Sequence, residues 1–199
     1  MQLRDKVIVI TGAARGIGRA IALRFAEEKP RALVLADIDV ASLEETARLA
    51  RGFAIPTNVQ IQPEVRQLVE TTERKFGPID LFCANAGIYL GGGFETKGED
   101  WDRIWRVNVL SHIYAAQALL PGMLQRGSGY LLHTVSAAGL LTDLSSAPYS
   151  VTKHAALAFA EHLAIAHGDR GLKVSCLCPQ FVLTDMVTQA AAPPTARGR

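Results

Sequence analysis

The sequence predicts a three-layer α/β fold in which a doubly wound parallel sheet lies between two layers of helices. Short runs rich in Val, Ile and Leu alternate with longer segments of helical pattern, as in repeated strand-helix-strand units. These runs are apolar almost throughout, which indicates strands that are covered on both faces. With 199 residues, the chain has room for one such domain and not for two large ones.

The predicted elements follow one another in a regular order. The strands are residues 7–10, 32–36, 53–55, 79–84, 130–135 and 172–178. The helices are residues 16–28, 41–50, 63–76, 148–167 and one long helix from Asp100 to just before Gly127. Pro63 and Pro148 stand at helix starts, where proline is tolerated. We expect the crossovers between parallel strands to be right-handed.

The composition excludes several functional classes. The 21 basic and 19 acidic residues leave a formal charge of +2 without a dense basic patch, so we expect no nucleic-acid partner. The longest uncharged stretch, residues 107–125, contains polar side chains and a proline, so we expect a buried helix and no membrane partner. The N-terminal residues lack the pattern of a signal peptide.

The cysteines and histidines show no metal-binding pattern. Cys83, Cys176 and Cys178 form neither a disulfide framework nor a metal-binding pair, so we interpret them as small buried side chains of a cytoplasmic protein. The five histidines include no His-Glu-x-x-His motif, and each is interpreted as a structural or surface residue. We therefore expect no bound metal.

The turn after the first predicted strand is rich in glycine. It reads Thr-Gly-Ala-Ala-Arg-Gly-Ile-Gly over residues 11–18 and leads directly into a helix. Glycines let the backbone approach a phosphate closely, and the helix N-terminus presents unpaired N–H groups to it. The segment predicts a dinucleotide site, with an ordinary tight turn as the alternative at this point.

Asp37 ends the second predicted strand, about 20 residues after the glycine turn. A carboxylate there accepts hydrogen bonds from both ribose hydroxyls of NAD. It would also repel the 2′-phosphate of NADP, so we expect NAD to be the preferred cofactor. Arg15 favours NADP instead, because an arginine nearby can accommodate the 2′-phosphate.

Tyr149 and Lys153 stand four residues apart at the start of a predicted helix, and therefore on one face of it. A cation beside a phenol favours the phenolate and brings proton transfer near neutral pH within reach. Alone, the pair could be ordinary neighbours on a helix surface. Ser136 follows the fifth predicted strand, so it should lie at the carboxyl edge of the sheet with Gly12 and residues 85–87, where ligands bind.

On these residues the chain resembles the short-chain dehydrogenase/reductase family. The matching motifs are Thr-Gly-x-x-x-Gly-x-Gly at residues 11–18, Asn-Ala-Gly at residues 85–87, Asn108, Ser136, Tyr149 with Lys153, and the segment 179–184. They run in the family's order from residue 5 to about residue 186. The resemblance implies a Rossmann fold and an oxidoreductase that uses a nicotinamide dinucleotide.

The resemblance also implies residue roles in a mechanism without a metal, in which a hydride passes between NAD and a secondary alcohol or ketone. Tyr149 would be the general acid and base, and Ser136 would orient the substrate oxygen. Lys153 would bind the nicotinamide ribose and lower the pKa of Tyr149, and Asn108 would support a proton-relay water. Other implied cofactor contacts are Gly12, Arg15, Gly16, Ile17, Gly18, Asp37, Asn58, Val59, Asn85, Ala86, Gly87, Pro179, Val182 and Thr184.

Two positions depart from the family pattern. Ala84 and Gln180 stand where many relatives have Asn and Gly, and we interpret both as tuning changes. The long helices from Asp100 and Pro148 carry more apolar surface than one sheet face needs, and such helices pair across subunits in the family, so we expect a homodimer or homotetramer. The alternative to an enzyme is a non-catalytic module of the same fold that binds NAD or pairs with a partner.

The substrate and the C-terminal end complete the expectations. The small and apolar loop 137–147, with Ile88, Tyr89 and Leu90, suggests an uncharged and fairly hydrophobic alcohol or ketone. We expect residues 1–186 to form a single dinucleotide-binding and catalytic domain with six strands and an exposed sheet edge. Residues 187–199 are interpreted as a flexible remnant of the lid region, without the lid and seventh strand usual in the family.

Overall fold

The computed structural model describes residues 1–184 and contains one parallel sheet in the strand order β3-β2-β1-β4-β5-β6. The strands are β1 (Val7–Thr11), β2 (Ala32–Asp37), β3 (Phe53–Pro56), β4 (Leu81–Ala84), β5 (Gly129–Thr134) and β6 (Leu172–Leu177). The order reverses between β1 and β4, which is the switch point at which doubly wound sheets bind their ligands.

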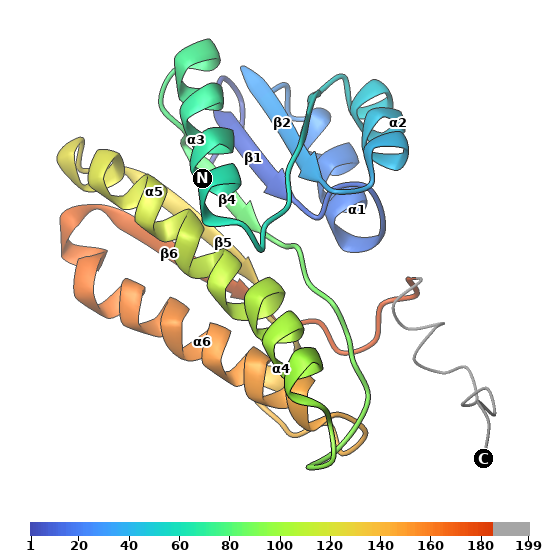
Figure 1. Ribbon diagram of the computed structural model, residues 1–199. Helices are drawn as coiled ribbons and strands as arrows, with labels where there is room; N and C mark the ends of the chain where they lie inside the picture. Colours follow the sequence, from blue (N-terminus) through green and yellow to red (C-terminus); the bar gives the residue numbers. More distant parts are fainter. Residues whose placement is uncertain (185–199) are drawn as a thin grey trace.

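Helices cover both faces of the sheet. They are α1 (Gly16–Ala26), α2 (Val40–Ala50), α3 (Gln62–Phe76), α4 (Gly98–Trp105), α5 (Ser111–Gln125) and α6 (Ala147–His167), with the short segments η1 (Arg106–Leu110), η2 (Ala137–Gly139) and η3 (Gly168–Arg170). Figure 1 shows α3, α5 and α6 on one face and α1 and α2 on the other. The predicted three-layer Rossmann fold is therefore confirmed.

Successive residues of the central strand serve two different cores. Val7 and Val9 of β1 pack in the cluster beneath α3, α5 and α6, whereas Ile8 and Ile10 pack in the cluster beneath α1 and α2. All four side chains are fully buried. Burial on both faces is the reason that these strands read as continuous apolar runs.

The sequence predicted one continuous α-helix from Asp100 to just before Gly127. That prediction is wrong in the middle of the segment, where the structure has a π-helical turn. The chain forms α4, then the π-helical turn η1, then α5. A π-helical turn places one more residue in each hydrogen-bonded loop than an α-helix does, and such turns are frequent at functional sites. Asn108, one of the predicted site residues, lies in the middle of η1 and is fully buried.

Two histidines that were interpreted separately form one buried pair. His112 of α5 and His133 of β5 have stacked rings, and their Nδ1 atoms are 2.7 Å apart. Only one of the two nitrogens can carry the shared proton, so the tautomers of the two rings are coupled. Burial lowers the pKa of His133 to about 4, and burial with the charges of His133 and Lys153 lowers the pKa of His112 well below its usual range.

Other expectations meet mixed outcomes. Cys83 is buried as expected, whereas Cys176 and Cys178 are only half-buried; all three are free thiols. Within residues 1–184, none of the helices combines the length and apolarity needed to cross a membrane. The expectations for residues 187–199 lie outside the described residues.

Candidate active site

The carboxyl ends of three neighbouring strands are tied together by Asn85, which follows β4. Its side-chain Nδ2 donates to the main-chain oxygens of Thr11 and Gly12, at 3.0 and 3.2 Å, and its Oδ1 accepts from Thr134 Oγ1 at 3.0 Å. The Thr11 hydroxyl in turn accepts from the backbone N–H groups of Asn85 and Ala86. These bonds hold the glycine-rich turn beside the ends of β4 and β5.

The glycine-rich turn leaves no room for side chains. Gly12 adopts φ +66°, and a Cβ atom there would lie 2.7 Å from Ala86 Cα. A Cβ at Gly18 would lie 2.1 Å from the carbonyl oxygen of Gly12. The N-terminus of α1 also lacks a side-chain cap. A bare turn that leads into an uncapped helix start fits a pyrophosphate, because backbone N–H groups can reach the phosphate oxygens.

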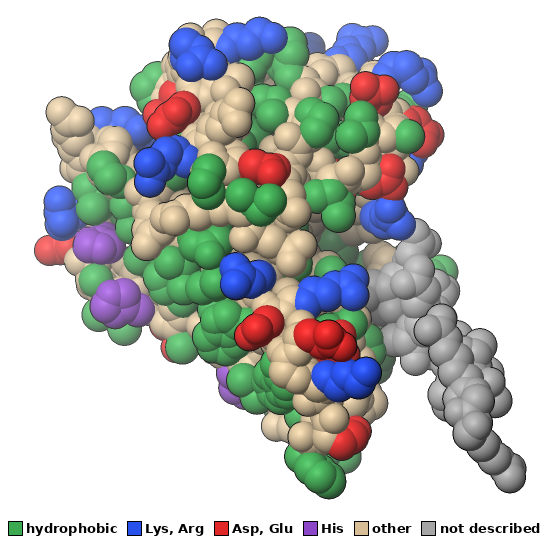
Figure 2. Space-filling model, viewed as in Figure 1, with side chains coloured by type: hydrophobic (Ala, Val, Ile, Leu, Met, Phe, Trp, Pro, Cys, Tyr) green, Lys and Arg blue, Asp and Glu red, His purple; other side chains and the backbone are tan. Residues whose placement is uncertain are grey.

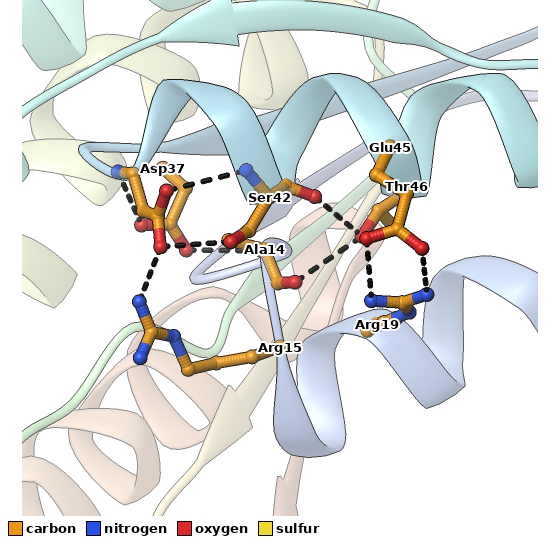
Figure 3. A network of polar contacts seen from close by, with 8 residues as sticks. Ala14, Arg15, Arg19, Asp37, Ser42, Glu45 and Thr46 are labelled. Atoms are coloured by element: carbon orange, nitrogen blue, oxygen red, sulfur yellow. Dashed lines mark hydrogen bonds and ion pairs between the residues drawn. The ribbon is translucent and has the colours of Figure 1, made fainter.

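Asp37, at the end of β2, is held by the backbone around it (Figure 3). Its two carboxylate oxygens accept from Ala14 N at 3.0 Å and from Asp39 N at 3.1 Å. Each carboxylate oxygen can accept more than one hydrogen bond, so the group retains acceptor capacity in a fixed orientation.

Arg15 contacts a carboxylate other than Asp37. Its guanidinium pairs with Asp39, whose side chain also caps α2 through Ser42 N at 3.2 Å and bonds the Ser42 hydroxyl at 2.9 Å. The bonds from Ser42, and then the charge of Arg15, lower the pKa of Asp39. The arginine that was the argument for NADP therefore has an acidic partner.

The predicted adenine-contacting residues follow β3. The side-chain Oδ1 of Asn58 accepts from both Gln60 N and Gln60 Nε2, at 3.0 and 3.3 Å. The acceptor that an adenine amino group would need is thus engaged in the residue's own turn. Val59 is buried and belongs to the core cluster beneath α3.

Lys153 is buried at the centre of the site. Its Nζ donates to Thr134 O at 3.1 Å and lies 5.5 Å from the centroid of the Tyr149 ring. A Cβ at Gly87 would be 3.4 Å from both Lys153 Nζ and Asn108 Oδ1, so these three residues meet in one place. Burial lowers the pKa of Lys153 to about 8, because the ammonium loses its hydration.

Asn108 holds the loop that follows β4. Its Oδ1 accepts from Ile88 N and its Nδ2 donates to Ile88 O, both at 2.9 Å, while the amide's second donor lies 3.3 Å from Thr152 Oγ1. Both N–H groups of the side chain are therefore used. The family resemblance implied that Asn108 supports a proton-relay water. In the structure its side chain holds the loop after β4, so the relay role stays a prediction.

Ser136 and Tyr149 come together through their hydroxyl groups. A hydrogen bond from Ser136 lowers the pKa of Tyr149, but burial has the larger effect, and the net pKa is raised. Asp143 and Tyr89 raise it further. The effects that shift this pKa come from burial, Ser136, Asp143 and Tyr89, and the lowering by Lys153 that the family resemblance implies stays a prediction.

The start of α6 is fixed by a residue that the sequence analysis missed. Ser146 Oγ accepts from Tyr149 N at 3.0 Å, which caps the helix, and donates to Leu90 O at 2.5 Å. A serine two residues before Pro148 is a helix-start signal, so this cap was readable from the sequence. The cap also sets where Tyr149 stands relative to the loop after β4.

The segment after β6 spans the two parts of the site. Ala137 N donates to Pro179 O at 2.8 Å, which places this proline beside Ser136. Further along, Thr184 lies against the glycine-rich turn, since a Cβ at Gly16 would be 3.3 Å from Thr184 Cγ2. Val182 between them is exposed. Residues 179–184 thus run from the predicted catalytic serine to the predicted phosphate site (Figure 1).

The fold and this edge of the sheet define a class of protein, the dinucleotide-binding oxidoreductases of the Rossmann type. The family model for short chain dehydrogenases matches residues 6–194. The chain belongs to this family.

Individual relatives agree with that assignment. The chain is 36% identical to 1-deoxy-11-beta-hydroxypentalenate dehydrogenase of Streptomyces exfoliatus, over 100% of this chain and 75% of the relative. It is 37% identical to rat 17-beta-hydroxysteroid dehydrogenase 13 over 90% of this chain, and it spans only 62% of that protein's length.

A solved short chain dehydrogenase/reductase from Burkholderia phymatum, crystallised with NAD, superposes with a TM-score of 0.90 at 32% identity. The match covers 100% of this chain and 74% of that one.

Proposed function

We propose that the protein transfers a hydride between NAD(H) and a secondary alcohol or ketone, with Tyr149 as general acid and base and without a metal. The observation that carries the proposal is the convergence of the Ser136 hydroxyl, the Tyr149 phenol and the buried Lys153 ammonium at the ends of β4 and β5. A protein that only bound a dinucleotide would not need these three groups at the opposite end of the site.

NAD, when bound, supplies the hydride acceptor for oxidation, and NADH supplies the donor for reduction. Ser136 donates a hydrogen bond to the substrate oxygen and fixes its position. Tyr149 takes the hydroxyl proton during oxidation and returns it during reduction. The charge of Lys153 stabilises the phenolate that forms, although the ring lies 5.5 Å from its Nζ. The glycine-rich turn and Asp37 hold the pyrophosphate and the ribose.

We infer that NAD is preferred over NADP. A 2′-phosphate would meet the carboxylate of Asp37 at short range, and Arg15 is already paired with Asp39. The comparison with a structure that contains NAD supports the same choice. Asp37→Ala tests it: we expect the ratio of kcat/KM for NAD to that for NADP to fall at least tenfold, about 1.4 kcal/mol. An unchanged ratio would contradict the role of Asp37.

The substrate is proposed to be an uncharged and bulky hydrophobic alcohol or ketone. Large apolar side chains stand exposed in the loops after β4 and β5, which border Tyr149: Phe94, Leu140, Leu141 and Leu144. Apolar rims of this kind bind apolar ligands. The relatives that act on a hydroxypentalenate and on hydroxysteroids support the proposal.

The experiment is a screen for turnover. NADH absorbance is followed with a panel of cyclic and open-chain secondary alcohols and ketones, in the wild type and in Tyr149→Phe. We expect turnover in the wild type and a loss of at least 100-fold in the variant, because general acid-base catalysis contributes about 10²- to 10⁴-fold. NADH binding without any turnover would favour the non-catalytic module, and full activity of Tyr149→Phe would contradict the mechanism.

We also propose a homodimer or homotetramer and a cytoplasmic location. Figure 2 shows hydrophobic side chains gathered over α5 and α6, and Val151 and Ile165 of α6 are 47% and 85% exposed. Light scattering in solution tests the oligomer, and Ile165→Glu should weaken it. The three free thiols support a reducing compartment.

A further inference from the structure

Tyr89, four residues after Asn85, packs its ring against the ring of Tyr149. The two ring centroids are 5.1 Å apart and the planes are tilted by 58°. At this separation the rings are in direct contact, in an arrangement that aromatic pairs favour. Tyr89 thus touches the phenol that the proposed function uses, although it lies in a different loop.

The hydroxyl of Tyr89 is held on its far side. It lies 2.8 Å from Ser145 Oγ, which in turn donates to Asp143 Oδ1 at 2.5 Å. A carboxylate can only accept, so the Ser145 hydroxyl must donate to Asp143 and accept from Tyr89. The chain of bonds therefore has one direction, from Tyr89 through Ser145 to Asp143. Asp143 Oδ1 also accepts from Ser145 N at 2.9 Å, which fixes the carboxylate.

The backbone around Tyr89 is fastened to the start of α6. Gly92 N donates to Ser145 O at 3.1 Å, and Ala147 N donates to Gly92 O at 2.8 Å, as in a short parallel bridge. The preceding residue, Ile88, is held at both backbone groups by Asn108. The backbone on either side of Tyr89 is therefore fixed, and its ring can leave Tyr149 only by a side-chain rotation that breaks the bond between its hydroxyl and Ser145.

We propose that Tyr89 is a positioning residue for Tyr149, whose phenol it holds in place through ring contact while Ser145 and Asp143 hold Tyr89. The proposal rests on the proposed function in that Tyr149 is the acid and base. The physical reason is that a displacement of a reacting group by about 1 Å can cost about 100-fold in rate. The hydroxyl of Tyr89 contributes only by fixing the ring, so the ring should matter more than the hydroxyl.

The kinetic test compares three variants. Tyr89→Leu removes the ring contact and the hydrogen bond, and Tyr89→Phe removes the hydrogen bond alone. Tyr130→Phe is the matched control, because Tyr130 also lies 2.8 Å from a serine hydroxyl, that of Ser175, away from the site. We expect kcat to fall about 10- to 100-fold in Tyr89→Leu, a few-fold in Tyr89→Phe and not in Tyr130→Phe. Affinity for NADH should stay unchanged in all three.

A second measurement needs no substrate. The four tyrosines are labelled with ¹³C at the hydroxyl-bearing carbon, and the Tyr149 signal is assigned with Tyr149→Phe. In Tyr89→Leu we expect this signal to shift and its titration midpoint to fall toward that of an exposed tyrosine, because the phenol gains water. Tyr130→Phe should leave both unchanged. If Tyr89→Leu does not fold, Tyr89→Phe and Ser145→Ala are expected to shift the Tyr149 signal in the same direction by a smaller amount.

The two measurements separate the two proposals. A Tyr149 signal that does not move in any Tyr89 or Ser145 variant overturns the positioning role, whatever the turnover. If the Tyr149 signal moves in these variants but the wild type turns over no substrate, the result supports the positioning role and contradicts the proposed function. A moved signal with unchanged kcat shows that the contact is only structural, and overturns the inference.

Discussion

The two halves of the molecule differ in what they bury. In the half that runs from β1 to α3, the buried polar side chains among the described residues are all threonines: Thr11, Thr46, Thr57 and Thr72. In the half from β4 to β6 they are far more varied: Asn108, Ser111, His112, His133, Thr134, Ser136, Ser146, Ser150, Thr152 and Lys153. In the proposed function the first half holds the pyrophosphate through its backbone and adds the carboxylate of Asp37, whereas the second half supplies the reacting side chains.

The difference follows from the chemistry that each half is proposed to perform. A phosphate is held by backbone N–H groups, so the first half needs glycines and a well-packed apolar core. Proton transfer needs side chains with tuned pKa values, and these must be partly removed from water. Buried polar groups are costly unless they are paired, so the second half carries a network of side-chain bonds between elements.

The largest expected effect is that of Lys153→Met in the second half. A pKa of about 8, against about 10.4 in solution, means that burial of the ammonium costs about 3 kcal/mol. We expect turnover to fall about 10³-fold and the free energy of unfolding at pH 7 to rise. Activity assays and urea denaturation measure the two quantities, and exposed Lys173→Met is the control. A lower stability would show that Lys153 serves the fold.

In the first half the matching experiment is Gly18→Ala. A Cβ there meets the carbonyl oxygen of Gly12 at 2.1 Å, so the turn must open. We expect the dissociation constant for NADH to rise about 100-fold and the melting temperature to fall. Gly168→Ala is the control, since a Cβ at that position meets no atom within 4 Å. Normal NADH binding by Gly18→Ala would mean that the turn does not hold the cofactor.

Much of this contrast could be predicted from the sequence, and the reason is physical. Strand and helix positions follow from local periodicity, and the strand ends then place Gly12, Asp37, Asn85 and Ser136 at one edge. Contacts between loops are different, because they form only after the sheet has assembled. The Tyr89 and Ser145 hydroxyls meet across 56 residues, and no local pattern signals it. The π-helical turn around Asn108 was missed for the same reason.

The paired histidines predict a smaller, pH-dependent effect. An unfolded chain protonates its histidines near pH 6.5, whereas folding lowers the pKa of His133 to about 4 and that of His112 also. Stability therefore falls as the pH drops from about 6.5 to 4, by about 1.4 kcal/mol per pH unit for each neutral histidine. The double variant His112→Leu/His133→Leu should flatten this slope in urea denaturation at several pH values. Exposed His162→Gln should leave it unchanged.

The smallest expected effect comes from Asp143→Asn. The negative charge of Asp143 raises the pKa of Tyr149, and asparagine keeps the acceptor for Ser145 while removing the charge. In the reduction direction, which needs the protonated phenol, we expect the basic limb of the pH profile of kcat/KM to reflect a lower pKa of Tyr149. The shift should be less than one pH unit because the Asp143 carboxylate is partly exposed. Asp169→Asn, on η3, is the control. A shift to higher pH would reverse the assigned sign.

The π-helical turn η1 also sets the phase of the helices on either side of it. α4 packs against α6, and α5 packs against α3. The nearly continuous helical segment of α4, η1 and α5 therefore packs its apolar faces against two different helices. Each residue rotates an α-helix by about 100°. A π-helical turn holds one residue more than an α-helical turn, so deleting one residue from Arg106–Leu110 would restore a regular α-helix and change the direction of Asn108 relative to the loop that it holds. The length of this segment is therefore as specific as any side chain in it.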